Sequence, residues 1–206
     1  MTAALRWPSP WPGRVVLALA LLLLGRATAA AAPTQYNIDQ RYGSVGFSIS
    51  ELGLFDAQGN FRKFAGELAI DPADPARTKI DVVIDVGSVA MSSAQATQLV
   101  LSPAFFDVRE HPAIRFRSTS VAAIGPDRYL VSGLLRIRGV THAQKLTAVL
   151  TAEKAAGKDP ATAYFAVSGK LHRSAFGMTA NENFLGDVVR IVIHIHLALP
   201  ELAQAN

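Results

Sequence analysis

The chain has 206 residues, of which half are hydrophobic and 17% are charged, which suits one globular domain with its own core. Its formal net charge is +4, but Arg6, Arg14 and Arg26 precede Ala32 with no acidic residue among them, so the remainder carries only +1. This balance gives no indication of a nucleic-acid partner. The sequence contains no cysteine, which excludes disulfides, a lipid-modified cysteine and thiolate metal sites.

Residues 1–32 are typical of a secretory signal peptide. Arg6 and Arg14 are followed by the apolar run VVLALALLLL and then by the small residues ATAAAA. The run is too short to cross a bilayer, which takes about 20 residues. We therefore expect cleavage between Ala29 and Ala32 and a single domain over residues 33–206 that works in the periplasm or outside the cell. An uncleaved membrane anchor is the alternative.

Alternation of apolar and polar residues recurs along the rest of the chain, with turn residues between the segments, and predicts eight strands. They cover residues 44–50, 60–71, 79–86, 113–121, 128–138, 143–152, 161–171 and 187–199. Residues 92–101 break the alternation and form the one predicted helix. Ser92 or Ser93 is its expected N-cap, and Ser102-Pro103 is its expected end.

This pattern predicts an all-β fold and leaves two architectures open. Antiparallel strands in consecutive order leave two exposed edges, which closure into a barrel removes. A barrel of eight strands is just wide enough to be filled by its own side chains or to hold one slim ligand. The other architecture is a sandwich with a packed core.

Four stretches carry a resemblance to a known family. They are YNIDQRYGSVGFSIS at 36–50, SPAFFDVREHPAIRFRST at 102–119, GLLRIRGVT at 133–141 and HRSAFGM at 172–178. In this order, and over nearly all of the chain after the leader, they resemble the motifs of the YceI-like family. The resemblance implies an eight-stranded antiparallel lipocalin-like β-barrel with one short helix. It also implies a function, because characterised members bind polyisoprenoids such as polyprenyl pyrophosphates or isoprenoid quinones.

The chain also departs from the family pattern. The family often has histidine where this chain has Tyr42 and Glu51, and a His-Leu pair where it has Leu99-Val100. These positions are candidates for polar contacts near a cavity mouth, so the departures bear on the headgroup of a ligand more than on its apolar tail.

The predicted ligand-binding residues are the apolar residues that an inward strand face would present, together with two residues of the fourth motif. For each apolar position, a packed core is the alternative. The set is Val45, Phe47, Ile49, Phe64, Leu68, Ile80, Val82, Ile84, Ile114, Phe116, Val131, Leu135, Leu146, Phe165, Val167, Arg173, Phe176, Ile191 and Ile193.

Arg173 is the predicted polar contact of this set, because a guanidinium can bind a diphosphate or a quinone oxygen. Its alternative role is structural, in a salt bridge or as a clamp on carbonyl groups at a barrel end. The adjoining loop Asn181, Glu182 and Asn183 could assist, although a solvated turn is the favoured interpretation.

The sequence carries no motif of an enzyme. It has no cysteine nucleophile, no Gly-x-Ser-x-Gly elbow and no phosphate-binding glycine loop. His194 and His196 are expected on one outward strand face, which favours a surface role over a metal site. Asp81 and Asp85 are expected on an outward face as well, not as an acid/base pair.

We therefore predict a binding or carrier protein with no catalytic residue, no metal and no cofactor. Its expected partners are a polyisoprenoid or other long-chain lipid, a membrane in transient contact and, as an open option, a second copy in a homodimer. Two alternatives remain at this point: an isoprenoid-modifying enzyme that uses Arg173 with Glu182, and a structural or stress-protective barrel with a filled core.

Overall fold

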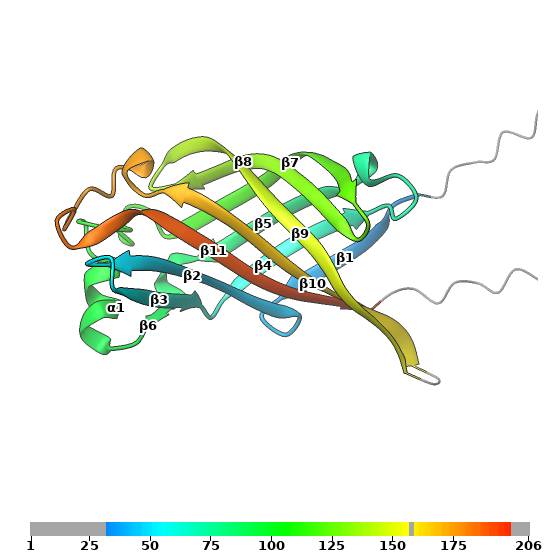
Figure 1. Cartoon of the computed structure of the whole chain (residues 1–206), viewed down its shortest axis with the longest axis horizontal. Helices are drawn as coiled ribbons and strands as arrows, with labels where there is room; N and C mark the ends of the chain where they lie inside the picture. Colours follow the sequence, from blue (N-terminus) through cyan, green and yellow to red (C-terminus); the bar gives the residue numbers. More distant parts are fainter. Residues whose placement is uncertain (1–31, 157–158, 199–206) are drawn as a thin grey trace, which may run out of the picture. The chain divides into compact units, whose positions relative to one another are not determined.

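The computed structural model describes residues 32–156 and 159–198, so the predicted signal peptide lies outside the described residues. Its strands form one antiparallel sheet that curls round an interior (Figure 1). They are β1 (Thr34–Asp39), β2 (Gly43–Glu51), β3 (Phe55–Phe61), β4 (Phe64–Ile70), β5 (Lys79–Asp85), β6 (Val89–Met91), β7 (Ala113–Gly125), β8 (Arg128–Ile137), β9 (Val140–Ala156), β10 (Asp159–His172) and β11 (Leu185–Ala198).

The sheet has eleven strands where the sequence predicts eight, and the difference arises from bends within long runs. β1 and β2 are separated only by residues 40–42, and β3 and β4 only by residues 62–63, so together they make one long bent hairpin. A one-turn 3-10 helix, η2 (Val86–Ser88), likewise separates β5 from β6. Counted as continuous runs, the strands number eight, which agrees with the predicted architecture.

The ladders between these runs close a ring. β1 pairs with β4, and β2 pairs with β3. In the next run, β5 pairs with β4 and β6 pairs with β3. β7 then pairs with β5, and β8 to β11 each pair with the strand before them. The last strand, β11, then pairs with β2 from Ile49↔Val189 to Gly43↔Ile195. The fold is therefore an all-β, lipocalin-like barrel, and the sandwich alternative is wrong.

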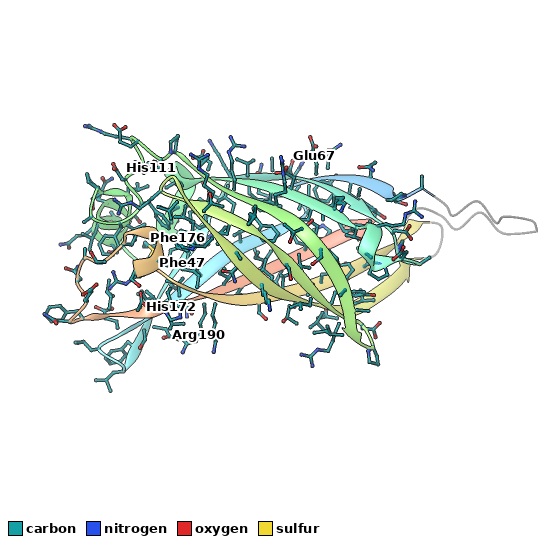
Figure 2. The ribbon with its side chains drawn as sticks, turned by 90° about the horizontal axis from the view of Figure 1, so that it is seen from above. Phe47, Glu67, His111, His172, Phe176 and Arg190 are labelled. Atoms are coloured by element: carbon teal, nitrogen blue, oxygen red, sulfur yellow. The ribbon has the colours of Figure 1, made fainter. Side chains whose placement is uncertain are left out.

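Each wall strand presents alternate residues to the interior, as the period of two requires. On β4, Phe64, Gly66 and Leu68 are buried while Ala65 and Glu67 are exposed. Figure 2 shows Glu67 and Arg190 on the outside of the barrel. The apolar alternation that predicted the strands thus also determines which face is inside.

The helix α1 (Ala94–Leu101) lies near its predicted position. Ser93 is the N-cap, since its side chain accepts a hydrogen bond from the backbone N–H of Ala96 at 3.1 Å, and the helix ends before Ser102. Thr97 Oγ1 accepts a hydrogen bond from the N–H of Met91 at 3.1 Å, which attaches the helix to β6. Within residues 32–156 and 159–198, no helix is long and apolar enough to cross a membrane.

Two glycines on the walls allow aromatic rings to approach the backbone. A methyl group on Gly133 of β8 would lie 2.5 Å from Cζ of Phe116, and one on Gly59 of β3 would lie 2.4 Å from Cζ of Phe47. No side chain other than hydrogen fits at such distances. The rings of Phe116 and Phe47 therefore occupy the space that a side chain on the neighbouring strand would otherwise fill.

Candidate functional site

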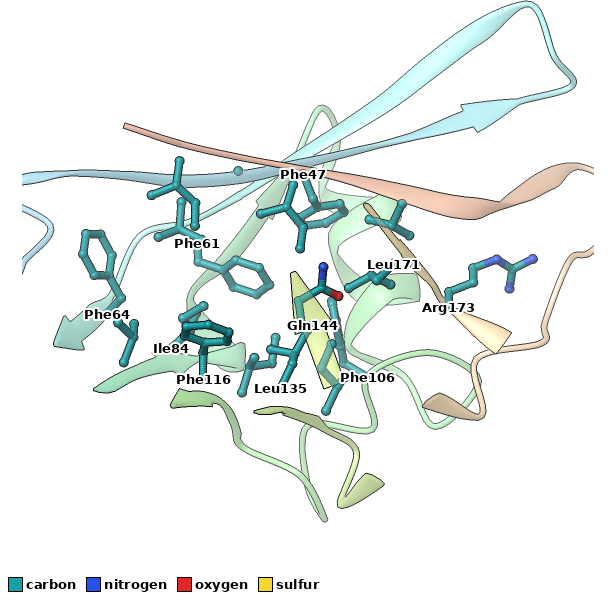
Figure 3. Close-up of a pocket in the computed structure, with 18 of the residues that line it drawn as sticks. Phe47, Phe61, Phe64, Ile84, Phe106, Phe116, Leu135, Gln144, Leu171 and Arg173 are labelled. Atoms are coloured by element: carbon teal, nitrogen blue, oxygen red, sulfur yellow. The ribbon is translucent and has the colours of Figure 1, made fainter. Parts of the chain in front are cut away.

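The barrel contains an apolar cavity of about 350 Å³, within the range of sites for small molecules (Figure 3). Aliphatic and aromatic side chains from nearly all the strands form its walls. Among the described residues that line it, the polar side chains are Glu51, Gln144 and Arg173. A lining of this composition excludes strongly hydrated ligands and favours long apolar ones.

The structure brings together almost all of the residues predicted to bind a ligand. Those that line the cavity are Val45, Phe47, Ile49, Phe64, Leu68, Ile80, Val82, Ile84, Ile114, Phe116, Val131, Leu135, Leu146, Val167, Arg173, Ile191 and Ile193. Phe165 and Phe176 do not line it. Phe165 is half-buried and packs against the core, and Phe176 lies in the 3-10 helix η3 (Ser174–Phe176), where its ring meets that of His142 edge-on at 5.1 Å.

The segment that includes α1 and the residues after it adds lining side chains that strand periodicity did not reveal. Phe106 packs its ring against those of Phe47 and Phe61, at centroid distances of 6.4 and 5.8 Å, and the last two rings are 5.6 Å apart. Phe105, Leu99 and Val100 also reach the cavity. The Phe-Phe pair of the second motif was the available signal, because two adjacent aromatic residues outside a strand need a site of burial.

Arg173 acts as a clamp on backbone carbonyls. It is 3% exposed, and its guanidinium donates to the carbonyl oxygens of Met178 (2.5 Å), Ala180 (2.7 Å), Gly186 (3.0 Å) and Leu185 (3.1 Å). Figure 3 shows the guanidinium pointing away from the other labelled side chains. The structural alternative for this residue therefore fits its geometry, and four of its five N–H groups are already engaged.

Gln144 of β9 is the polar side chain that lies among the apolar residues of the cavity (Figure 3). It is 8% exposed, and its Nε2 donates to the carbonyl oxygens of Lys145 at 2.8 Å and Lys170 at 3.1 Å. Sequence reasoning missed it, because a lone glutamine in an alternating strand looks like an outward residue.

The cavity opens at the end of the barrel where β2 turns into β3. Glu51 and Leu99 line the cavity and are exposed at the same time. The turn beyond Glu51 presents Leu52, Leu54 and Phe55, which are 58%, 77% and 71% exposed. The N–H of Leu52 donates to the carbonyl of Phe184 at 2.7 Å, and Phe184 is itself 59% exposed. The mouth therefore has an apolar rim contributed by two loops.

The positions that depart from the family pattern lie in different surroundings. Glu51, Leu99 and Val100 line the cavity near the mouth. Tyr42 packs against the core outside the lining, with its ring 5.9 Å from that of His196. Three of the four departures therefore line the cavity near its mouth.

The Asp187 carboxyl, at the same end, has a perturbed pKa. Hydrogen bonds, first from the backbone N–H of Ser174 and also from His172, hold the pKa of the Asp187 carboxyl below its ordinary value against the opposing effect of desolvation. The Asp187 oxygens lie 2.9 Å from the nitrogen of Ser174 and 2.7 Å from Nδ1 of His172. Both hydrogen bonds are exposed, and none of the residues that form them lines the cavity. They join the end of β10 to the start of β11.

Other titratable candidates lie on the outer surface. Asp81 accepts hydrogen bonds from Arg117, and Asp85 caps η2 by accepting from the N–H of Gly87. His196 stacks its ring near that of Tyr164 at 5.9 Å. In the part of the chain that the structure describes, no group of three or more histidine or acidic side chains could hold a metal ion.

Comparison with known proteins gives a consistent result. A family model described as YceI-like domain matches residues 36–197. A UPF0312 protein of Photorhabdus laumondii is 33% identical over 78% of this chain and 83% of its own length. A UPF0312 protein of Azotobacter vinelandii is 32% identical over 87% of this chain and 93% of its own length.

Two solved structures share the fold. The crystal structure of Burkholderia cenocepacia BcnA has a TM-score of 0.70 and 24% identity, covering 78% of this chain and 99% of that one. A polyisoprenoid binding domain from Saccharophagus degradans has a TM-score of 0.57 and 14% identity, covering 82% and 99%. At these identities the likeness concerns the fold.

Proposed function

The chain belongs to the YceI-like domain family, and on that premise we propose that it binds a polyisoprenoid or a similar long apolar molecule inside its barrel and carries it without chemical change. The observation that carries the proposal is the apolar cavity of about 350 Å³ within the barrel. A cavity of this size disagrees with the alternative of a filled, purely structural core.

The free energy of moving a lipid between a membrane and the barrel favours reversible carriage over permanent retention. Burying one CH₂ group from water stabilises by about 0.8 kcal/mol, so a five-carbon isoprene unit gains about 4 kcal/mol. The ligand's other environment is a bilayer, whose chains are as apolar as leucine. Exchange between membrane and barrel is then close to neutral, and the selection of one lipid over another depends on cavity shape and on the few polar groups.

The apolar rim supports transient contact with a membrane. Leu52 has a φ of +52°, a left-handed conformation that is costly for a residue with a branched side chain, and Gly53 follows with +69°. This turn holds Leu52 and Leu54 in solvent, where they add nothing to the core. A bilayer would bury them and bring its lipids to the cavity mouth.

Binding without catalysis fits the chemistry of the lining. The enzyme alternative requires Arg173 with Glu182, but the Arg173 guanidinium is engaged by four carbonyls and Glu182 is exposed in its loop. A catalytic site would bring titratable groups together around a reacting atom. We also propose export of the chain through residues 1–32, and its work in the periplasm or outside the cell, on the strength of the leader sequence.

The test is native mass spectrometry of the gently purified protein, followed by organic extraction. We expect a long-chain lipid to be recovered, or an empty barrel to take up added polyprenyl alcohol, diphosphate or isoprenoid quinone. Ala57→Trp places an indole in the cavity and should reduce uptake at least tenfold, whereas Gln58→Trp, on the exposed face of the same strand, should leave it unchanged. Failure of the wild-type barrel to carry or take up any of these lipids contradicts the proposal.

A further inference from the structure

We propose that the cavity recognises a hydroxyl group on its ligand through the side-chain oxygen of Gln144, an inference that rests on the proposed lipid-binding function. On this proposal, the preferred ligand is a long apolar alcohol or a hydroquinone, and lipids whose oxygens only accept hydrogen bonds bind less well. Two features carry it: the fixed orientation of the amide, and the surroundings of its oxygen.

The amide orientation follows from its partners. One terminal atom lies 2.8 Å from the carbonyl oxygen of Lys145 and 3.1 Å from that of Lys170. Carbonyl oxygens accept hydrogen bonds and cannot donate them, so this atom is the NH₂ group. Both of its N–H groups are thereby used. If the amide were turned by 180°, its oxygen would face the two carbonyl oxygens instead.

The position of Gln144 in the sheet explains why the side chain is held there. The ladder between β9 and β10 ends at Leu146↔Gly169, and the carbonyls of Lys145 and Lys170 that accept from Gln144 lie just beyond this end. The Gln144 amide donates to both and so links the two strands one step beyond the ladder. The amide is thus part of the wall and does not swing freely.

The oxygen of the same amide has no such engagement. The residue is 8% exposed and lines the cavity, and among the described residues nothing donates a hydrogen bond to Oε1. In the described part of the chain no fully buried side-chain oxygen lacks a partner, so Oε1 keeps a surface open to the cavity. A ligand that covers Oε1 without donating to it leaves a buried acceptor unsatisfied, at a cost of about 1–3 kcal/mol. A ligand that places a hydroxyl at this point removes that cost, and one that places only an acceptor or a methylene there does not.

The neighbouring polar groups do not change this selection. Arg173 donates to four carbonyls, and Glu51 lies at the exposed mouth. The remaining lining is apolar. At the depth of Gln144 the cavity therefore offers a single fixed acceptor, which discriminates a hydroxyl from a quinone or ether oxygen.

The experiment compares farnesol with farnesyl methyl ether, which differ in the hydroxyl donor. We expect the wild-type protein to bind the alcohol about tenfold more tightly in a titration, as one buried hydrogen bond implies. Gln144→Met keeps the volume and removes the acceptor, so the ratio should fall to about one. Gln58→Met, on the exposed face of β3, should keep the wild-type ratio.

A second measurement does not depend on a variant that must fold. In wild-type protein labelled at the glutamine side-chain carbonyl, the Gln144 signal should move on adding the alcohol and stay on adding the ether. Equal affinities in the wild type overturn this inference, as does a preference that survives in Gln144→Met. If the wild type binds neither lipid and no polyprenyl or quinone lipid in the uptake assay, the proposed function itself fails.

Discussion

Arg173 shows how a charged residue can be almost fully buried without a carboxylate. Its hydrogen bonds run to four carbonyl oxygens within residues 178–186, which hold the connection from β10 to β11 against the barrel end. Carbonyl dipoles gathered around a guanidinium replace part of its hydration. The side chain thus positions the loop that carries Phe184, one of the two loops that form the apolar rim.

We expect Arg173→Met to lower the free energy of unfolding by about 3 kcal/mol, because several buried carbonyls lose their charged donor. Urea denaturation followed by circular dichroism measures this loss. Arg190→Met is the control: Arg190 pairs with Asp56 at 3.3 Å on the surface, and exposed pairs of this kind contribute at most about 1 kcal/mol. Equal effects of the two substitutions would contradict the clamp.

At the scale of elements, the bent hairpin from β1 to β4 has two tasks. Within the hairpin, β1 pairs with β4 and β2 pairs with β3. The hairpin closes the ring of strands because β2 also pairs with β11 and β4 also pairs with β5. Its turn between β2 and β3 extends past the mouth with Leu52, Leu54 and Phe55 exposed. The element that closes the barrel therefore also forms the surface proposed to meet a membrane.

The double substitution Leu54→Ser and Phe55→Ser should slow lipid exchange with phosphatidylcholine vesicles at least fivefold, since it removes the apolar side chains that a bilayer would bury. The affinity for a lipid presented in detergent should stay the same, because neither residue lines the cavity. A fluorescent lipid-transfer assay measures the rate.

Ile124→Ser provides the control for the rim. Ile124 is 51% exposed on β7, next to the β7–β8 turn, and the antiparallel order places that turn at the barrel end away from the β2–β3 turn. An equal loss of transfer rate in both variants would show that general surface hydrophobicity is responsible, and would remove the rim from the mechanism.

The elements also show what could be predicted from sequence. β2 was predictable because Val45, Phe47 and Ile49 alternate with small residues, and α1 because Ser93 has the chemistry of an N-cap. β1 was missed because its pairing with β4 depends on a bend at residues 40–42 that no local pattern encodes. The inward apolar faces gave most of the cavity walls.

The polar part of the site was less accessible to prediction. The role of Gln144 depends on the end of a ladder, and that of Arg173 on carbonyls of a folded loop. Both are properties of backbone arrangement in three dimensions, and sequence spacing does not fix them.

At the scale of the whole molecule, the cavity and the barrel share one set of side chains. Most of the residues that line the cavity, such as Ile84 and Leu135, are also members of the core or packed against it. A ligand therefore completes the packing of the interior, and binding should stabilise the folded state.

We expect a bound lipid at a free concentration of one hundred times its dissociation constant to stabilise the fold by about 2.7 kcal/mol, which raises Tm by roughly 5–10 °C. Differential scanning calorimetry of lipid-free and lipid-loaded protein measures the shift. The Ala57→Trp variant, which binds at least tenfold more weakly, should show about half of this shift or less under the same conditions. A shift of the same size in that variant would place the lipid outside the barrel.

Of Gly133 and Gly59, the second gives the barrel a way to change during evolution. Each makes room for an aromatic ring, but a methyl group added to Gly133 would also meet the backbone carbonyl of Arg117 at 2.5 Å. At Gly59 the nearest atoms belong to the side chains of Phe47 and Met91, so a methyl group there would push the ring of Phe47 toward the lumen. The bore can thus be narrowed by one codon change at Gly59, with strand register and closure left intact. Related barrels that carry alanine at the position of Gly59 should have diverged toward slimmer ligands.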